Sequence, residues 1–149
     1  MLQIDLKNAY NSVSRAHMLE CVRAKAPAFA AWADWTYGQP APLVVNEKVT
    51  ILSQEGVQQG DPLGPLFFAL AALPIAQKLC QIPNLLWSGW YLDDGNLAGS
   101  LQAFQSCIEL LRREGPNLGL FLNASKSTIT GLNLSRELLA LHGWRTSHS

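Results

Sequence analysis

The sequence predicts an α+β fold in which an antiparallel sheet packs on helices. Short runs of bulky apolar residues alternate along the chain with longer segments of helical periodicity. Pairs of these short runs are joined by turn-forming residues, as in β-hairpins, at 43–53 and 87–98. Strands interleaved with helices and paired as hairpins favour an antiparallel sheet. With 149 residues and 48% hydrophobic content, the chain is expected to form one domain with a substantial core.

The first elements are expected to be a strand and two helices. Leu2–Leu6 is predicted to be a short strand, and a helix is predicted over Ser14–Ala26 with Asn11 or Ser12 as its cap. A second helix is predicted over Ala28–Tyr37. The apolar face of the first helix is expected to consist of Met18, Leu19, Val22 and Ala26.

A strand pair and a long helix are expected in the middle of the chain. After a proline-containing break, Leu43–Val45 and Val49–Ser53 are predicted to pair around a turn at 46–48. A helix is then predicted over Leu63–Leu79, where Pro74 should kink or end it.

The last third is expected to hold a hairpin, a helix and two short elements. Leu101–Glu114 has the pattern of an amphipathic helix that stops at Gly115 and Pro116. A strand is predicted over Gly119–Leu122 and a short helix over Ser135–Leu141. The apolar face of the amphipathic helix is expected to consist of Phe104, Cys107, Ile108 and Leu111.

The hairpin predicted over Trp87–Ala98 carries two adjacent acids. Gly95 and Asn96 are expected to supply its turn, which places Asp93 and Asp94 near the tip. Like charges side by side repel and need full solvation or a cation. Mg²⁺ prefers carboxylate oxygens and keeps positions open for phosphates, so the pair fits a metal-assisted site. Aspartate is also common at hairpin tips because it tolerates turn geometry, and this alternative remains open.

Two further segments add to this hypothesis. Two-metal sites require carboxylates from separate segments that converge, and Asp5 at the end of the first strand could join the hairpin pair. The loop over Glu55–Leu66 contains Gly60 and Gly64, which permit close approach of a ligand, and it leads into a helix start that favours anions. Taken alone, Asp5 also fits a solvated strand-end acid, and the loop an ordinary connection.

Four segments, in this order, resemble the palm domain of a reverse transcriptase. They are Asp5–Tyr10, Gln58–Pro65, Tyr91–Asp94 and Gly119–Ser127. The sequence QGDPLGP in the second segment resembles that of the non-LTR, LINE-like retrotransposon branch more than those of retroviral or group II intron enzymes. The resemblance implies a polymerase palm, with the antiparallel sheet packed on helices and the catalytic hairpin at Trp87–Ala98. The whole chain, 1–149, is then a partial palm domain.

The resemblance also implies roles for three acids. Asp5, Asp93 and Asp94 match the metal-binding aspartates of an RNA-directed DNA polymerase, which uses two Mg²⁺ ions, or Mn²⁺, for nucleotidyl transfer. Such chemistry depends on positioning and on neutralising charge, and metal ions supply both.

The resemblance also implies roles for four other residues, and two of them have an alternative interpretation from the sequence alone. Tyr10 matches an aromatic gate against the sugar 2′-hydroxyl, and without the family it reads as a half-buried packing residue. Gln59 and Gly60 match positions that contact the incoming nucleotide and template. Lys126 matches a lysine near the leaving pyrophosphate, and otherwise fits a solvated surface lysine.

Charge balance bears on the expected partners. The chain has 11 basic and 11 acidic residues, whereas nucleic-acid-binding domains usually carry a basic surplus. We therefore expect that the fingers and thumb, and any endonuclease segment of the parent polyprotein, lie outside this chain. An active enzyme would use an RNA template, a DNA primer and deoxynucleotide triphosphates. The alternatives are a non-catalytic relic or truncated palm, or an unrelated acidic metal-binding hairpin domain.

Composition sets an expected location. The three cysteines Cys21, Cys80 and Cys107 are scattered and odd in number, which is typical of reduced, buried thiols. The longest apolar stretch, Leu66–Ala76, is too short to span a bilayer, and no signal peptide is apparent. An intracellular protein of the cytoplasm or nucleus is expected.

Overall fold

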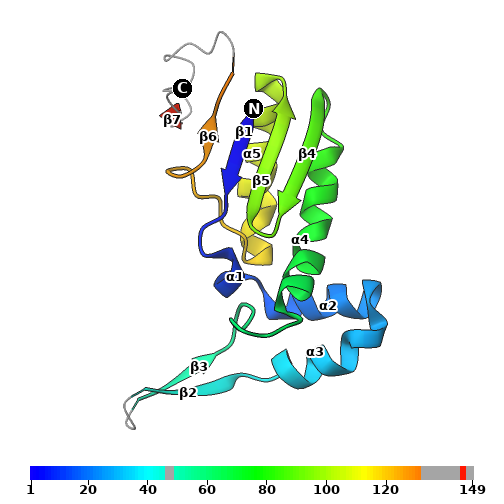
Figure 1. Cartoon of the computed structure of the whole chain (residues 1–149), viewed down its shortest axis with the longest axis vertical. Helices are drawn as coiled ribbons and strands as arrows, with labels where there is room; N and C mark the ends of the chain where they lie inside the picture. The colour runs from blue at the N-terminus through cyan, green and yellow to red at the C-terminus, as the bar shows by residue number, and fades with distance from the viewer. Residues whose placement is uncertain (46–48, 132–144, 147–149) are drawn as a thin grey trace.

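The computed structural model describes residues 1–45, 49–131 and 145–146, and shows an α+β fold built on a five-stranded sheet (Figure 1). The strand order is β4-β5-β1-β6-β7, with antiparallel neighbours apart from the parallel pair β6 and β7. The strands of this sheet are β1 (Leu2–Asp5), β4 (Leu85–Tyr91), β5 (Asp94–Gly99), β6 (Thr128–Ile129) and β7 (Arg145–Thr146). The predicted fold class is confirmed.

Helices α4 and α5 lie behind one face of the sheet, while α2 and α3 lie beyond its lower end in Figure 1. Two 3₁₀ turns, at Pro27–Phe29 and Gly115–Leu118, follow α2 and α5 respectively. The helices are α1 (Ala9–Ser12), α2 (Arg15–Lys25), α3 (Ala30–Tyr37), α4 (Gly64–Cys80) and α5 (Leu101–Glu114). Within the described residues, no helix combines the length and apolar character that a bilayer crossing requires.

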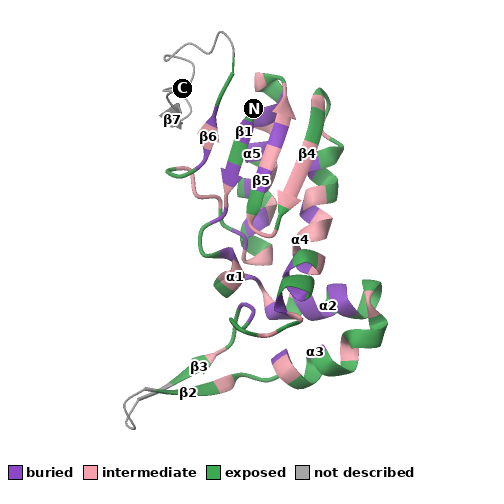
Figure 2. Ribbon diagram, in the orientation of Figure 1, coloured by how far each residue is buried: buried purple, intermediate pink, exposed green. Residues whose placement is uncertain are grey.

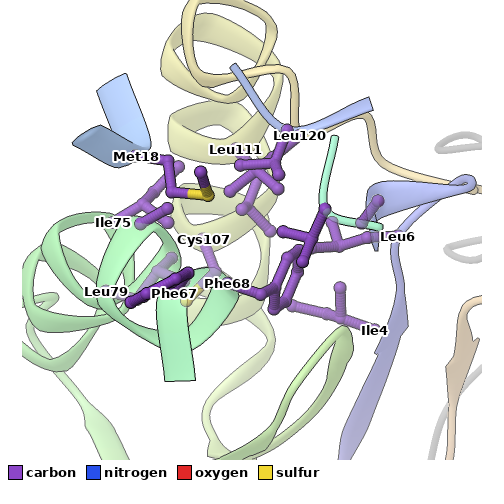
Figure 3. Packing of buried hydrophobic residues seen from close by; sticks show 14 of the residues in the cluster. Ile4, Leu6, Met18, Phe67, Phe68, Ile75, Leu79, Cys107, Leu111 and Leu120 are labelled. Carbon is purple, nitrogen blue, oxygen red and sulfur yellow. The ribbon is translucent and has the colours of Figure 1, made fainter. Parts of the chain in front are cut away.

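The core fills the space between this sheet face and the helices (Figure 3). Side chains alternate along β1, so Leu2 and Ile4 point into the core while Gln3 is exposed. Phe67 and Phe68 of α4 are fully buried in the same cluster. The expected apolar face of α5 is confirmed, with Phe104, Cys107, Ile108 and Leu111 all buried.

A two-stranded ribbon projects from the body of the molecule (Figure 1). It consists of β2 (Ala41–Val45) and β3 (Val49–Ser53), which pair antiparallel as predicted. Its described apolar side chains are exposed (Figure 2): Leu43, Val44, Ile51 and Leu52.

Several predicted details are wrong. The N-cap of α2 is Ser14, whose hydroxyl accepts the His17 N–H, and neither Asn11 nor Ser12 has this role. The region predicted as one helix over 28–37 begins with a 3₁₀ turn. Of the two outcomes predicted for Pro74, an end of the helix is wrong, because Pro74 lies inside α4, and a kink stays a prediction. Cys80 is exposed, whereas the other two cysteines are buried as expected.

The strand predicted over Gly119–Leu122 is also wrong. Gly119 caps the 3₁₀ turn with a φ of 74°, a left-handed conformation that does not occur inside a strand. A Cβ at this position would also collide with the backbone of Ser12. Beyond it, Leu122 forms a single antiparallel bridge with Leu6. The helix predicted over Ser135–Leu141 lies outside the described residues.

Candidate active site

The pairing of β1 with β5 brings two predicted site residues together. Asp5 lies directly opposite Asp94, and Gln3 lies opposite Asn96. Because Leu2 and Ile4 occupy the alternate positions and face the core, Asp5 and Asp94 share the sheet face away from the helices. Opposed residues in an antiparallel pair hold their Cβ atoms about 4.5–5.5 Å apart. Two carboxylates therefore meet at the lower end of the sheet in Figure 1.

The hairpin between β4 and β5 places the third carboxylate. Tyr91 pairs with Asp94, so the turn consists of Leu92 and Asp93. The predicted turn at Gly95 and Asn96 is wrong, because both residues lie in β5. Leu92 has a φ of 53°, which is costly for an apolar residue and marks a strained tip.

Gly95 has a packing role in place of the predicted turn role. The Trp90 indole lies against it on the core side of the sheet, and a Cβ at Gly95 would come within 2.7 Å of that ring. The Trp90 ring also donates a hydrogen bond to the Ser88 hydroxyl at 3.1 Å. The position after the acid pair therefore has no room for a Cβ unless the Trp90 ring moves. The ring packs against the core and supports the hairpin on the core side of the sheet.

The backbone of Asp5 is fixed by hydrogen bonds, while one of its side-chain oxygens has no partner among the residues that the structure describes. Its N–H donates to the Ser127 hydroxyl at 3.1 Å, and its carbonyl accepts the Asn123 N–H at 2.9 Å. The Oδ1 atom is buried and has no hydrogen-bond partner among the described residues. A buried carboxylate oxygen without a donor is costly, and a bound cation would remove that cost.

The three acids nevertheless do not form a closed set of metal ligands. No group of three His, Cys, Asp or Glu side chains in the described part of the chain is arranged to hold a metal ion. Asp93 is half-buried and Asp94 is exposed, so both can approach a cation from the solvent side. The donor chemistry and the unpaired Asp5 oxygen fit Mg²⁺ or Mn²⁺, and closure around an ion requires side-chain adjustment.

Lys126 lies on the turn that holds Asp5. Its N–H and that of Ser127 both donate to the Asn123 carbonyl, and the Ser127 hydroxyl donates there too, at 2.8 Å. Ser127 is fully buried, whereas Lys126 is exposed. Sequence reasoning missed Ser127, although a serine four residues after an asparagine at a turn is a signal for such a local bond.

Tyr10 and the loop before α4 form a second group. The Tyr10 carbonyl accepts the Val57 N–H at 2.7 Å, and its ring packs on Phe68 with 5.6 Å between centroids. A Cβ at Gly64 would come within 2.5 Å of the Tyr10 hydroxyl. Burial, with a smaller contribution from the charge of Asp61, raises the pKa of the Tyr10 hydroxyl above its ordinary value.

Gln59 and Gly60 form the exposed tip of this loop. Gly60 has a φ of 92° and open space where a Cβ would lie, so backbone conformation alone favours glycine there. A cavity of about 490 Å³ beside the loop is lined in part by Gln58, Gln59 and Asn11. Side-chain amide groups therefore line part of this cavity.

A buried arginine missed by sequence reasoning supports the loop. Arg15 donates to the Ser53 carbonyl and hydroxyl at 2.6 and 2.8 Å, and to the Gly56 carbonyl at 2.9 Å. Burial lowers the pKa of its guanidinium below the ordinary value. β1 leads into α1, and Tyr10 of α1 contacts the loop before α4. In Figure 1 the end of the sheet that carries the carboxylates lies beside α1, and the loop lies below it.

Comparison with known proteins gives two matches. The family described as reverse transcriptase (RNA-dependent DNA polymerase) matches residues 1–141. The "Retrotransposable element SLACS 132 kDa protein" of Trypanosoma brucei gambiense is 27% identical over 139 residues. That alignment covers 89% of this chain and 12% of the relative, so the chain corresponds to a small part of that protein.

Proposed function

Because this chain belongs to the reverse transcriptase family, we propose that it forms the nucleotidyl-transfer centre of a retrotransposon RNA-directed DNA polymerase of the non-LTR type. The observation that carries the proposal is the pairing of Asp5 with Asp94, together with the buried Oδ1 of Asp5, which has no hydrogen-bond partner in the part of the chain that the structure describes. Opposed acids on an open sheet face repel each other unless a cation lies between them.

In this proposal Asp5, Asp93 and Asp94 hold two Mg²⁺ ions, or Mn²⁺. When bound, such ions neutralise phosphate charge and orient the attacking and leaving oxygens. The protein contributes a rigid support: the Asp5 backbone is fixed on both sides by Asn123 and Ser127. Asp93 lies in the two-residue turn with Leu92, whose φ is 53°, and Asp94 begins β5.

Lys126 would place a cation near the leaving pyrophosphate. Its turn is bonded to the Asp5 backbone, so the ammonium group and the carboxylates belong to one local framework. A long flexible side chain that is exposed can reach toward developing negative charge on phosphate oxygens.

The second group would select the nucleotide. Tyr10 would pack against the sugar and reject a 2′-hydroxyl, and its contacts with Phe68 and Gly64 support this role. Gln59 and Gly60 would contact the incoming nucleotide and the template base through amide and backbone groups.

The partners of this centre would be an RNA template, a DNA primer and deoxynucleotide triphosphates. The chain carries no net charge, so most contacts to phosphate backbones are assigned to segments that correspond to fingers and thumb. The small share of the relative that is matched is consistent with this division.

A non-catalytic relic is the second candidate. The observation that favours it is the absence of a preformed three-ligand metal cluster among the described residues, together with the neutral charge. A palm that folds but binds neither metal nor nucleic acid would need neither a preformed metal site nor a basic surplus.

Primer extension separates the two candidates. The purified 149-residue chain is incubated with poly(rA)–oligo(dT), dTTP and Mg²⁺, beside an Asp93→Asn/Asp94→Asn control of equal melting temperature. Extension that is lost in the control supports the catalytic proposal for this chain. Equal extension in both proteins would contradict the site assignment. If a folded chain extends nothing, even when fingers and thumb segments are supplied, the relic is favoured.

A further inference from the structure

The tip Gln59–Gly60 is flanked by two residues that meet at one hydroxyl group. Tyr37, the last residue of α3, donates its hydroxyl hydrogen to Oδ2 of Asp61 and accepts the Gln58 N–H at 3.2 Å. Gln58 precedes the tip and Asp61 follows it. The hydroxyl oxygen of one residue in α3 therefore holds both ends of the exposed tip by hydrogen bonds.

Asp61 adds local bonds to this tie. Its Oδ1 accepts the Leu63 N–H at 2.9 Å, its N–H donates to the Gln58 carbonyl at 3.2 Å, and its carbonyl accepts the Gly64 N–H at 3.0 Å. These bonds close the loop into a compact turn that leads directly into α4. Asp61 also lies near the predicted sugar gate, because a Cβ at Gly64 would come within 2.5 Å of the Tyr10 hydroxyl and 3.5 Å of the Asp61 Cβ.

The Tyr37 side chain is itself immobilised. It is 2% exposed, its ring meets Phe67 edge to face with 6.0 Å between centroids, and the Arg15 guanidinium lies 5.2 Å from its ring centroid. Burial, followed by the hydrogen bond to Asp61, raises the pKa of Tyr37 far above its ordinary value. The hydroxyl therefore stays protonated and remains a donor across the working pH range.

We propose that Tyr37 is a positioning residue that, through Asp61, holds Gln59 and Gly60 in the orientation that receives the incoming nucleotide. This inference rests on the proposed function and extends it to a residue outside the four matched segments. Tyr37 touches no substrate, and it acts by removing freedom from the backbone that does. A fixed tip lowers the entropy lost when a nucleotide binds.

Tyr37→Phe isolates the hydroxyl. The ring, its contact with Phe67 and its stacking with Arg15 are kept, while the Gln58 N–H and Asp61 Oδ2 each lose a partner. Asp61→Asn and Asp61→Ala form a graded pair, because the amide keeps one oxygen that can accept from Tyr37. Ile75→Val is the matched control: it lowers stability slightly in the core, about 16 Å along α4 from Gly64.

Two readouts decide the inference. Amide hydrogen exchange of 58–63 is measured without ligand, and dTTP affinity is measured with Mg²⁺ by equilibrium dialysis, on the 149-residue chain. We expect Tyr37→Phe to speed exchange at Gln58 about tenfold and to weaken dTTP binding about fivefold. Ile75→Val should change neither, and Asp61→Asn should be milder than Asp61→Ala. Where extension is measurable, KM for dTTP should rise with kcat nearly unchanged.

Unchanged exchange at 58–63 in Tyr37→Phe would overturn the inference, and so would faster exchange without weaker dTTP binding. If Ile75→Val changes amide exchange and dTTP affinity as much as Tyr37→Phe does, Tyr37 contributes only to overall stability, and the inference is also overturned. If the unsubstituted chain binds no dTTP, even when fingers and thumb segments are supplied, the proposed function fails for this chain. The exchange comparison still decides whether Tyr37 fixes the loop.

Discussion

The end of the sheet that carries the acids and the loop before α4 are built in opposite ways. At the sheet end, the Oδ1 atom of Asp5 is buried without a partner among the described residues, and Asp94 is exposed. In the loop, Arg15 and Tyr37 bond to backbone and side chains on several sides. Both regions are proposed to serve one reaction.

The difference follows from what each region is proposed to bind. Carboxylates that receive a cation must keep oxygens free of protein donors, at a cost to stability. A loop that positions a nucleotide gains from being ordered beforehand, because less freedom is lost on binding. The first region should therefore respond to metal, and the second to changes in packing.

The largest expected effect is that of Asp5→Asn on activity. The change keeps the shape of the side chain but removes a metal-binding charge, so primer extension should fall on the order of a thousandfold. The melting temperature without metal should be unchanged or higher, because the variant loses the negative charge that faces Asp94 and that includes a carboxylate oxygen buried without a donor among the described residues. A large drop in melting temperature with modest loss of extension would assign Asp5 a structural role.

The next effect is on stability, at Gly56. Its φ of 71° is strained for other residues, and a Cβ would come within 2.3 Å of the Asn11 carbonyl oxygen. We expect Gly56→Ala to lower the free energy of unfolding by about 3 kcal/mol, measured by urea denaturation. Gly60→Ala is the control: it has open space, so its cost should be about 1–2 kcal/mol. Equal costs would show that close packing does not hold the loop base.

Tyr10→Ala tests whether the second region selects the sugar. Loss of the ring should relax discrimination against ribonucleotides roughly a hundredfold, measured as the ratio of kcat/KM for dTTP and UTP. Tyr10→Phe keeps the ring and should keep most of the selectivity. Unchanged selectivity in Tyr10→Ala would return this residue to simple packing against Phe68.

The smallest expected effect comes from Ser127, the support of the first region. Ser127→Ala removes the acceptor for the Asp5 N–H and a donor to the Asn123 carbonyl. We expect a loss of about 1–2 kcal/mol in the free energy of unfolding. Extension should fall more than in Ile75→Val, a core control of similar cost. Equal extension by Ser127→Ala and Ile75→Val would show that Ser127 does not position Asp5 for the reaction.

Periodicity predicted the elements that have one apolar face and clear ends. The helix at Leu101–Glu114 and the strand at Val49–Ser53 have the predicted bounds, because capping and turn residues mark them. The order of the four matched segments predicted the family. The structure also places Asp5 beside Asp94, which strand spacing alone could not specify.

Tertiary contacts decided the details that the sequence did not reveal. Gly95 was predicted to form a turn, but it lies in β5, paired with Ile4 and Trp90, and the Trp90 ring occupies the space beside it. Gly119 was predicted to start a strand, but the backbone of Ser12 occupies the space where its side chain would lie. Tyr37 bonds to Asp61, and Ser127 bonds to Asp5, across more than 20 residues of the chain, and no local pattern marks these two pairs. A local pattern marks only the bond from Ser127 to the Asn123 carbonyl.

The central claim is that Asp5, Asp93 and Asp94 hold divalent metal. The most direct test titrates Mn²⁺ into the 149-residue chain with dTTP present and measures free Mn²⁺ by electron paramagnetic resonance. We predict bound Mn²⁺ in the unsubstituted chain, a large loss of affinity in Asp5→Asn and in Asp93→Asn, and unchanged affinity in Ile75→Val. Equal Mn²⁺ binding in the unsubstituted chain and the two aspartate variants, or no binding in any of them, would contradict the claim.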